Sequence, residues 1–230
     1  MIAADKPGRG NGVYVAYPDV DGGDLSAWAW GFSRVTDYLL TRPDVDAKRV
    51  VFTGHSRGGK ACLLAGALDE RAALVVPNGS GCGGAGCYRI QPPKTEDLAA
   101  ITAPNRYFYW FEPHFREFAG HEDRLPFDQH ELKACVAPRA LLETSATGDV
   151  WANGPGTQAT HEATMEVYKF LVVPQRFGIH WRPGKHEHNL VDWTALLDFA
   201  DAQFTGKPPA QDFDERAFPD QAKAYAWKAP

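Results

Sequence analysis

The sequence predicts an α/β fold with a mostly parallel sheet, because short strand-like runs alternate with longer helical patterns along the chain. Runs typical of strands lie at residues 50–53, 140–145 and 177–182. Helical patterns lie at residues 26–40, 60–68 and 191–204. With 230 residues and a 44% hydrophobic fraction, the chain can bury one sizeable core. We therefore expect a single domain over residues 1–230, in which residues 205–230 form a proline-rich, charged extension that wraps around it.

The most informative motif joins the first of these strands to the helical pattern that follows it. Residues 54–59 read Gly-His-Ser-Arg-Gly-Gly, and the order of strand, Gly-x-Ser-x-Gly and helix is the nucleophile elbow of an α/β-hydrolase. The elbow is a strained turn, so a side chain at Gly54 or Gly58 is expected to collide with the neighbouring strand or helix. Ser56 is therefore the candidate nucleophile, and the predicted architecture is a three-layer sandwich. The alternative is a loop that contains this short pattern by chance.

A serine hydroxyl needs a base, and in this fold the partners follow in the order Ser, acid, His. His186 lies on a loop between the strand-like run at 177–182 and the helical pattern at 191–204, where the fold keeps its base. His188 is the nearest rival, and His55 is adjacent to the serine itself. A lone histidine is more often a surface or core residue than a catalyst, so position favours His186.

The acid is expected on a loop at the carboxyl end of the strand before the histidine region, where it can accept the imidazole Nδ1 proton. Residues 140–145 form that strand, and Asp149 lies just beyond it. The alternative role for Asp149 is that of a turn residue beside Gly148. Glu143 lies within the strand and is not expected to reach the loop face.

Two cations flank the serine. Arg57 follows Ser56 directly, and Lys60 is one helical turn further on. A guanidinium at this place stabilises the oxyanion of a tetrahedral intermediate by charge and by hydrogen bonding. The alternative is a pair of solvated residues at a helix start, where positive charge is slightly unfavourable. The two cations therefore indicate a substrate of anionic or strongly polar character.

Few strands precede the elbow. Only residues 12–17 read as a possible extended segment before the helical pattern at 26–40, whereas this fold normally has several earlier strands. We therefore expect a sheet that lacks its N-terminal strands, either because the chain is a fragment or because the fold has been trimmed. Such a sheet would expose an unpaired edge.

Charge and composition exclude several function classes. The net charge of −5 argues against nucleic-acid binding, and no apolar stretch approaches the ~20 residues of a membrane span. The four cysteines have no spacing typical of a zinc site, and the chemistry of the motif needs no metal or other cofactor. The first residues do not read as a signal peptide.

Several segments together resemble one family. These are Gly-His-Ser-Arg-Gly-Gly-Lys at 54–60, Ser-Gly-Cys-Gly-Gly-Ala at 80–85, Leu-Pro-Phe-Asp-Gln-His at 125–130, Ala-Pro-Arg at 137–139 and Arg-Pro-Gly-Lys-His at 182–186. The chain resembles the glucuronoyl esterases, carbohydrate esterase family 15, of the bacterial type, from about residue 24 to residue 204. The resemblance implies that Ser56 is the nucleophile, Arg57 stabilises the oxyanion and His186 is the base. It also implies substrate contacts to the glucuronate ring by Lys60, Glu96 and Trp151, whereas Gln129 lies in a family motif without an assigned contact.

The chain departs from the fungal members of the family at two places. Fungal members carry the catalytic glutamate directly before the Ser-Gly-x-Gly-Gly element, where this chain has Gly79. Some bacterial relatives use an acid after the later strand instead, which agrees with Asp149. Fungal members also form a disulfide between a cysteine beside the serine and a cysteine after the histidine. His55 and Asn189 occupy the comparable positions here, so that disulfide cannot form.

The resemblance implies a serine esterase that cleaves the ester between 4-O-methylglucuronic acid of glucuronoxylan and an alcohol of lignin, through an acyl-enzyme and without a metal. It also implies a secreted or periplasmic location. Two alternatives stay open. One is a hydrolase on the same scaffold that acts on acetylated or feruloylated sugars, and the other is a catalytically silent, truncated hydrolase.

Overall fold

The computed structural model describes residue 8 and residues 12–230, and within them the sheet has four parallel strands. In sheet order the strands are β1 (Val51–His55), β2 (Leu74–Asn78), β3 (Ala140–Ala146) and β4 (Phe177–Arg182). Neighbouring strands pair in parallel throughout. The predicted parallel sheet and its three predicted strands are therefore confirmed.

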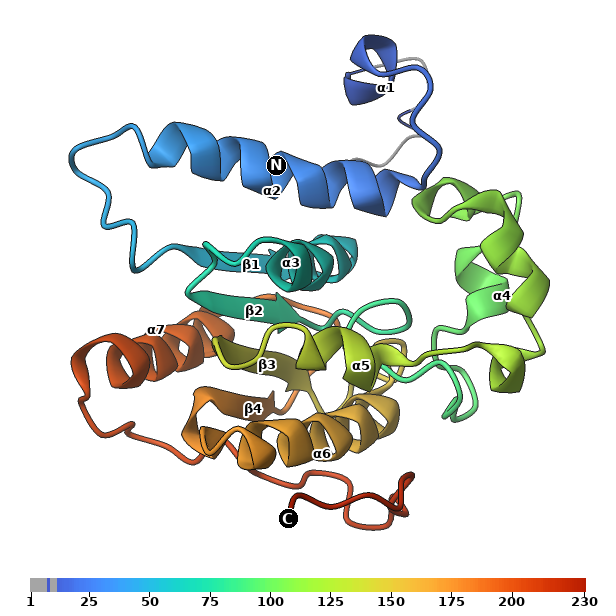
Figure 1. Cartoon of the computed structure of the whole chain (residues 1–230). Helices are drawn as coiled ribbons and strands as arrows, with labels where there is room; N and C mark the ends of the chain where they lie inside the picture. Colours follow the sequence, from blue (N-terminus) through green and yellow to red (C-terminus); the bar gives the residue numbers. More distant parts are fainter. Residues whose placement is uncertain (1–7, 9–11) are drawn as a thin grey trace.

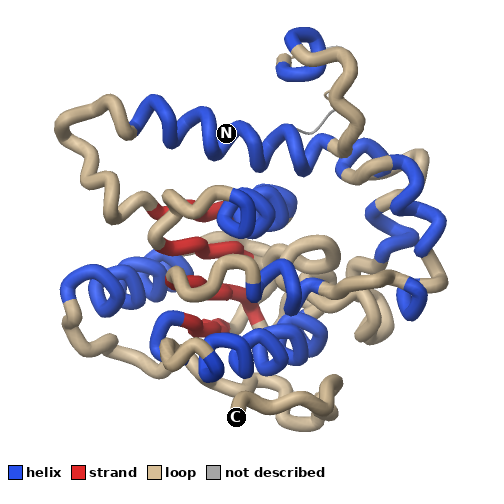
Figure 2. Tube along the Cα trace, in the orientation of Figure 1, coloured by secondary structure: helices blue, strands red, loops and turns tan. Residues whose placement is uncertain are grey.

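Helices cover both faces of the sheet, which gives three layers (Figure 1). The long helices are α2 (Asp24–Leu39), α3 (Arg57–Leu68), α6 (Gly154–Phe170) and α7 (Leu190–Thr205). The shorter ones are α1 (Val13–Ala16), α4 (Leu98–Ile101), α5 (Gln129–Ala134) and the 3₁₀ turns η1 (Phe108–Trp110), η2 (Pro113–Phe118), η3 (Glu122–Arg124) and η4 (Pro174–Arg176). Figure 2 shows the strands enclosed between these helices. The three predicted helices correspond to α2, α3 and α7.

The two faces of the sheet follow the alternation of side chains along each strand. Val75 and Leu141 pack in the cluster beneath α3 and α6, whereas their neighbours Leu74 and Leu142 pack against Phe199 of α7. Every residue of β2 and β3 is buried. Strands of a parallel sheet that is covered on both faces are expected to be buried in this way.

A third cluster consists mainly of aromatic side chains and lies beside the start of α2 and α3. Trp28, Tyr88 and Trp110 are 6%, 3% and 3% exposed, and Phe111, Phe115 and Phe118 pack partly buried against this cluster. The aromatic segment around η1 and η2 therefore contributes to the core.

The prediction for residues 12–17 is wrong. They form the short helix α1, in which the amide of Tyr17 donates to the carbonyl of Val13 at 2.8 Å. Within residues 8 and 12–230, no strand precedes β1. Strand β2 and helix α6 were not predicted. β2 is only five residues long and contains Pro77, which is unusual within a sheet.

Residues 206–230, which follow α7, contain no helix. This segment packs along α6, where Tyr225 Oη donates to the carbonyl of Glu162 at 2.7 Å and the amide of Ala229 donates to Glu166 at 2.7 Å. None of the helices in the described part of the chain has the length and apolar character that a membrane crossing needs.

Candidate active site

Ser56 lies at the sharp turn between β1 and α3. Its backbone has φ 56° and ψ −123°, a conformation that residues other than glycine rarely adopt. The chain can turn this tightly because position 54 is glycine: a Cβ on Gly54 would lie 2.3 Å from the carbonyl oxygen of Gly58. The elbow and the need for Gly54 are therefore confirmed.

The same prediction is wrong for Gly58. A Cβ on Gly58 would meet no atom of a neighbouring segment within 4 Å, so a side chain there has open space. Gly59 is the constrained residue, since its Cβ would lie 2.9 Å from both the carbonyl oxygen of Gly54 and the Cβ of Ser80. The start of α3 therefore packs against the elbow through Gly59.

Ser56, His186 and Asp149 form a continuous hydrogen-bonded chain. Nε2 of His186 lies 2.9 Å from Oγ of Ser56, and Nδ1 of His186 lies 2.6 Å from Oδ2 of Asp149. Asp149 is 5% exposed, and its Oδ1 accepts a hydrogen bond of 3.2 Å from the amide of Ala152. This geometry lets His186 take the serine proton while Asp149 orients the ring and stabilises the imidazolium. The structure thus brings the three predicted triad residues together.

The two rival histidines lie beside the triad without entering it. The ring of His55 is 4.6 Å from that of His186 and 5.7 Å from that of His188. Nδ1 of His55 bonds to Oδ1 of Asn78 at 2.6 Å, and the ring of His188 stacks on Trp193 at 4.7 Å. Burial lowers the pKa of both rings, with repulsion from His186 adding to the effect on His55. Both shifts favour the neutral form of the ring beside His186.

Glu143 is excluded as the acid by its position within β3. It is 1% exposed and forms ion pairs with Lys133 of α5 and His161 of α6. The expectation that Glu143 does not reach the loop face is therefore confirmed.

Gly79 lies next to the carboxylate of Asp149. A Cβ on Gly79 would lie 3.5 Å from Oδ2 of Asp149 and 3.6 Å from Cε1 of His55. The backbone of Gly79 has φ 47°, which favours glycine. A side chain from position 79 or from position 149 could therefore reach the same place beside His186, and in this chain Asp149 occupies it.

Lys60 and Glu96 form a buried ion pair beside the nucleophile. Nζ of Lys60 lies 2.6 Å from Oε2 of Glu96 and 2.6 Å from each of the carbonyl oxygens of Ser80 and Cys82. The two side chains are 1% and 4% exposed. Burial raises the pKa of Glu96, and the charge of Lys60 opposes that rise. An ammonium has three donors, and all three are used here to hold Glu96 and residues 79–86, which we call the glycine-rich loop.

The remaining residues named from the sequence are Arg57, Trp151 and Gln129. Arg57 is the first residue of α3, so its amide lies at the positive end of the helix directly after the nucleophile. Trp151 is half-buried, its carbonyl accepts from the amide of Glu96 at 2.9 Å, and its ring lies 6.0 Å from the guanidinium of Arg106. Gln129 is 1% exposed and donates to the carbonyl of Gly84, so it supports the glycine-rich loop.

Sequence reasoning missed the contacts that join the loops carrying the acid and the base. The amide of Thr147 donates to the carbonyl of Arg182 at 2.9 Å, and a Cβ on Gly148 would lie 2.5 Å from the carbonyl oxygen of Gly184. No local pattern marks such contacts, because the two segments are far apart in sequence. The role of Asn153 as the N-cap of α6 was also missed, although Asn-Gly-Pro at the start of this helix is a helix-start signal.

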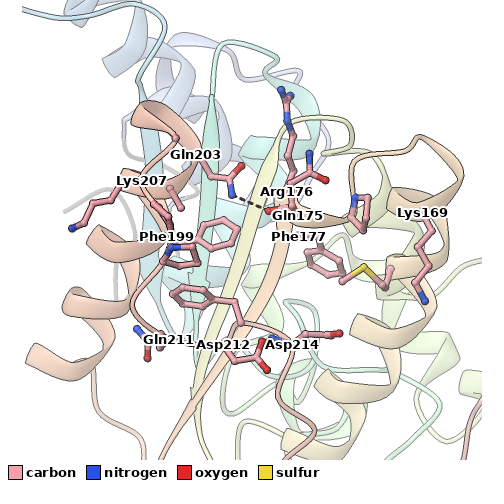
Figure 3. A pocket seen from close by; sticks show the side chains of 17 residues that line it. Lys169, Gln175, Arg176, Phe177, Phe199, Gln203, Lys207, Gln211, Asp212 and Asp214 are labelled. Atoms are coloured by element: carbon pink, nitrogen blue, oxygen red, sulfur yellow. Dashed lines mark hydrogen bonds between the residues drawn. The ribbon is translucent and has the colours of Figure 1, made fainter.

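Two cavities lie away from the triad. One of about 680 Å³ is bounded by α2, α3, α5 and the aromatic cluster, and Lys60 is one of its lining residues. The other, of about 580 Å³, lies at the amino end of β4 (Figure 3). Phe177, Phe199 and Asp214 line its wall. None of the three triad residues lines either cavity. In the described part of the chain, no three acidic, histidine or cysteine side chains are placed to hold a metal ion.

The chain is similar to known esterases in sequence and in structure. Residues 2–172 match the family model described as glucuronyl esterase of fungi. The carbohydrate esterase MZ0003, from an unknown prokaryotic organism, is 39% identical over 199 residues, which is 80% of this chain and 45% of that protein. The 4-O-methyl-glucuronoyl methylesterase of Schizophyllum commune is 37% identical over 182 residues, or 76% of this chain and 45% of that enzyme.

A solved structure gives the same result for the fold. The carbohydrate esterase family 15 glucuronoyl esterase from Caldicellulosiruptor kristjansonii superposes with a TM-score of 0.92 at 37% identity, covering 100% of this chain and 64% of that one. The chain spans about half the length of the curated relatives it matches. The family match, the strained elbow and the triad agree, and the chain belongs to the glucuronoyl esterases of carbohydrate esterase family 15.

Proposed function

We propose that this protein is a serine esterase that hydrolyses the ester between 4-O-methylglucuronic acid of glucuronoxylan and alcohol groups of lignin. The observation that carries the proposal is the hydrogen-bonded chain from Ser56 through His186 to Asp149, directly beside the buried Lys60–Glu96 pair. The name of the Schizophyllum commune relative supports the uronic ester as the substrate class.

The reaction follows from the positions of the three triad residues. His186 takes the proton of Ser56 as Oγ attacks the ester carbonyl, and Asp149 stabilises the imidazolium that forms. The amide at the start of α3 and the guanidinium of Arg57 hold the oxyanion. His186 then gives its proton to the departing alcohol. Water repeats the sequence on the acyl-enzyme and releases the uronic acid.

Sugar binding is assigned to Lys60, Glu96 and Trp151. Glu96 accepts hydrogen bonds from ring hydroxyls, because a carboxylate has more acceptor sites than its bond to Lys60 uses. Lys60 favours the charged form of Glu96 and fixes its position, and it reaches a hydroxyl only by exchanging one of its carbonyl partners. Trp151 offers a half-buried apolar face to the pyranose ring.

The proposal is tested by the release of acid from benzyl glucuronate and methyl glucuronate, beside a neutral aryl acetate and a feruloylated sugar. We expect turnover of both glucuronates and a loss of about 10⁶-fold in kcat for Ser56→Ala. If the acetate or the feruloyl ester is turned over faster than the glucuronates, the proposed substrate class is wrong, while the serine esterase mechanism stands. A folded, unmodified protein that neither turns over a glucuronate nor reacts with a phosphonate probe at Ser56 would refute the proposal.

A further inference from the structure

The loop that carries the catalytic histidine joins the end of β4 to the start of α7. Residues 183–187 of this loop are exposed, yet His186 must keep distances of 2.9 Å to Ser56 and 2.6 Å to Asp149. A displacement of about 1 Å at a reacting group can cost about 100-fold in rate. The loop therefore needs a support that fixes its backbone.

A buried guanidinium lies beneath this loop. The side chain of Arg182 is 2% exposed, and its Nη2 donates to the carbonyls of Glu187 at 2.5 Å and Lys185 at 3.4 Å. Its Nη1 donates to the carbonyl of Pro183 at 3.1 Å. The acceptors of Nη2 are the residues immediately before and after His186, so one planar group holds the backbone on both sides of the catalytic ring.

The guanidinium is itself held in place by α7 and by the loop. Nε of Arg182 donates to Oδ2 of Asp192 at 2.8 Å, and Asp192 is 0% exposed. The same carboxylate accepts from the amide of Asn189 at the start of α7. Gly184 has φ 114°, and a Cβ there would lie 2.8 Å from Nη1. The close approach of the loop to the guanidinium therefore depends on glycine at this position.

Arg182 also contacts the loop of the acid. Its carbonyl accepts from the amide of Thr147 at 2.9 Å, two residues before Asp149. One residue thus bonds to both segments that supply the partners of Ser56.

We propose that Arg182 is a positioning residue for the catalytic histidine, because its guanidinium fixes the backbone on either side of His186 and so sets the distances to Ser56 and Asp149. A lysine cannot replace it, since an ammonium lacks the planar fork that reaches three carbonyls and a carboxylate together. The assignment concerns the same site as the proposed function, and only its turnover readout rests on that function.

The chain contains a matched control at the other end of the sheet. Arg139 precedes β3, and its guanidinium donates to the carbonyls of Gly66, Asp69, Ala72 and Cys135. Arg139→Lys and Arg182→Lys remove the same chemical group, in the half-buried Arg139 from four carbonyls and in the buried Arg182 from three carbonyls and a carboxylate. Both variants are expected to lose stability in urea titration, but only Arg182→Lys is expected to move the triad.

The experiment measures kcat and KM on methyl glucuronate together with the downfield proton resonance of Nδ1–H of His186, identified by its loss in Asp149→Asn. For Arg182→Lys we expect kcat to fall about 100-fold with KM nearly unchanged, and the resonance to broaden or disappear. For Arg139→Lys we expect both to match the unmodified protein. The proposal would be overturned if Arg182→Lys kept the kcat of the unmodified protein and an intact resonance. It would also be overturned if Arg182→Lys and Arg139→Lys lost kcat and the resonance to the same extent.

A second variant covers the case in which Arg182→Lys does not fold. Asp192→Asn keeps the shape of the side chain and removes the charge that anchors Nε, and it is expected to lower kcat about tenfold and weaken the resonance. An unchanged resonance and kcat in this variant would then refute the proposal. If the unmodified protein shows the resonance but no turnover, the proposed function fails, and the positioning role is decided by the resonance alone. Absence of the resonance in the unmodified protein would itself overturn the positioning role.

Discussion

The Lys60–Glu96 and Lys133–Glu143 pairs have nearly the same chemistry and burial but different surroundings. The side chains of the first pair are 1% and 4% exposed, and those of the second are 0% and 1% exposed. The other donors of Lys60 bond to carbonyls of the glycine-rich loop beside Ser56. Lys133 bonds to the carbonyl of Thr157 and the hydroxyl of Thr160 in α6. A buried charge pair therefore does not mark the active site by itself, and the backbone that the pair holds decides its role.

The difference also applies to the acids near β3. Glu143 lies in the strand and faces Lys133 and His161 of the helical layer, whereas Asp149 lies beyond the carboxyl end of the strand and faces His186. Parallel strands bring their carboxyl ends to one edge of the sheet, and loops at that edge supply catalytic residues. The residues within the strand supply packing and ion pairs instead.

The largest expected effect separates these two acids. Asp149→Asn removes the charge that stabilises the imidazolium of His186, and kcat on methyl glucuronate is expected to fall about 10⁴-fold. Glu143→Gln, the matched variant, is expected to leave kcat per folded molecule unchanged while lowering stability. Both are measured by initial rates on protein whose folded fraction is known from circular dichroism. An equal loss of kcat in the two variants would show that Asp149 and Glu143 do not differ in their roles in catalysis.

The next effect concerns stability. Lys133→Met leaves Glu143 buried without its lysine, and the free energy of unfolding is expected to fall by about 3–5 kcal/mol. Urea titration at neutral pH measures this loss. The rate per folded molecule on methyl glucuronate should stay at the level of the unmodified protein. A variant with full stability and reduced kcat would instead place Lys133 in the catalytic machinery.

Lys60→Met is expected to change stability and function together. It leaves Glu96 unpaired and frees the glycine-rich loop, so kcat/KM on methyl glucuronate should fall on the order of 100-fold, the equivalent of one or two hydrogen bonds to charged groups. Labelling of Ser56 by a small phosphonate should persist, because the triad itself is retained. Rates for Lys60→Met that equal those for Lys133→Met, after correction for folding, would show that neither pair contacts the substrate.

The smallest expected effect is a pH dependence of stability that arises from His161, which contacts Glu143 of the second pair. Burial alone would lower the pKa of His161, but its interactions with Asp214 and Glu143 outweigh burial and the repulsion of Lys133 and raise it. A raised pKa stabilises the fold below the unfolded value of about 6.5, and this contribution is lost as pH rises through the folded pKa. The destabilisation by His161→Gln should therefore be larger at pH 5.5 than at pH 9.

His180 supplies the control of opposite sign. Burial lowers its pKa, so its contribution is present above pH 6.5 and is lost as pH falls toward the folded pKa. His180→Gln should accordingly change stability in the opposite direction with pH. Denaturant titrations of both variants at the two pH values test this, and slopes of the same sign would contradict the assignment.

Sequence alone determined the features that depend on local geometry. The elbow was predictable because a reversal this sharp needs glycine at position 54 and places Ser56 in a strained conformation. The order Ser, acid, His and the loop positions of Asp149 and His186 followed from the direction of parallel strands. Three strands and three helices were predicted from their periodicity, which is a property of consecutive residues.

Only the tertiary structure decided the features that depend on segments far apart in the chain. It identified Gly59 rather than Gly58 as the glycine that permits close packing, because the neighbours of Gly59 come from the elbow and the loop after β2. It showed that Glu96 and the glycine-rich loop together use all three donors of Lys60, and that Arg182 holds the histidine loop. Contacts between distant segments leave no periodic signal in the sequence, since their geometry exists only once the sheet has brought the loops to one edge.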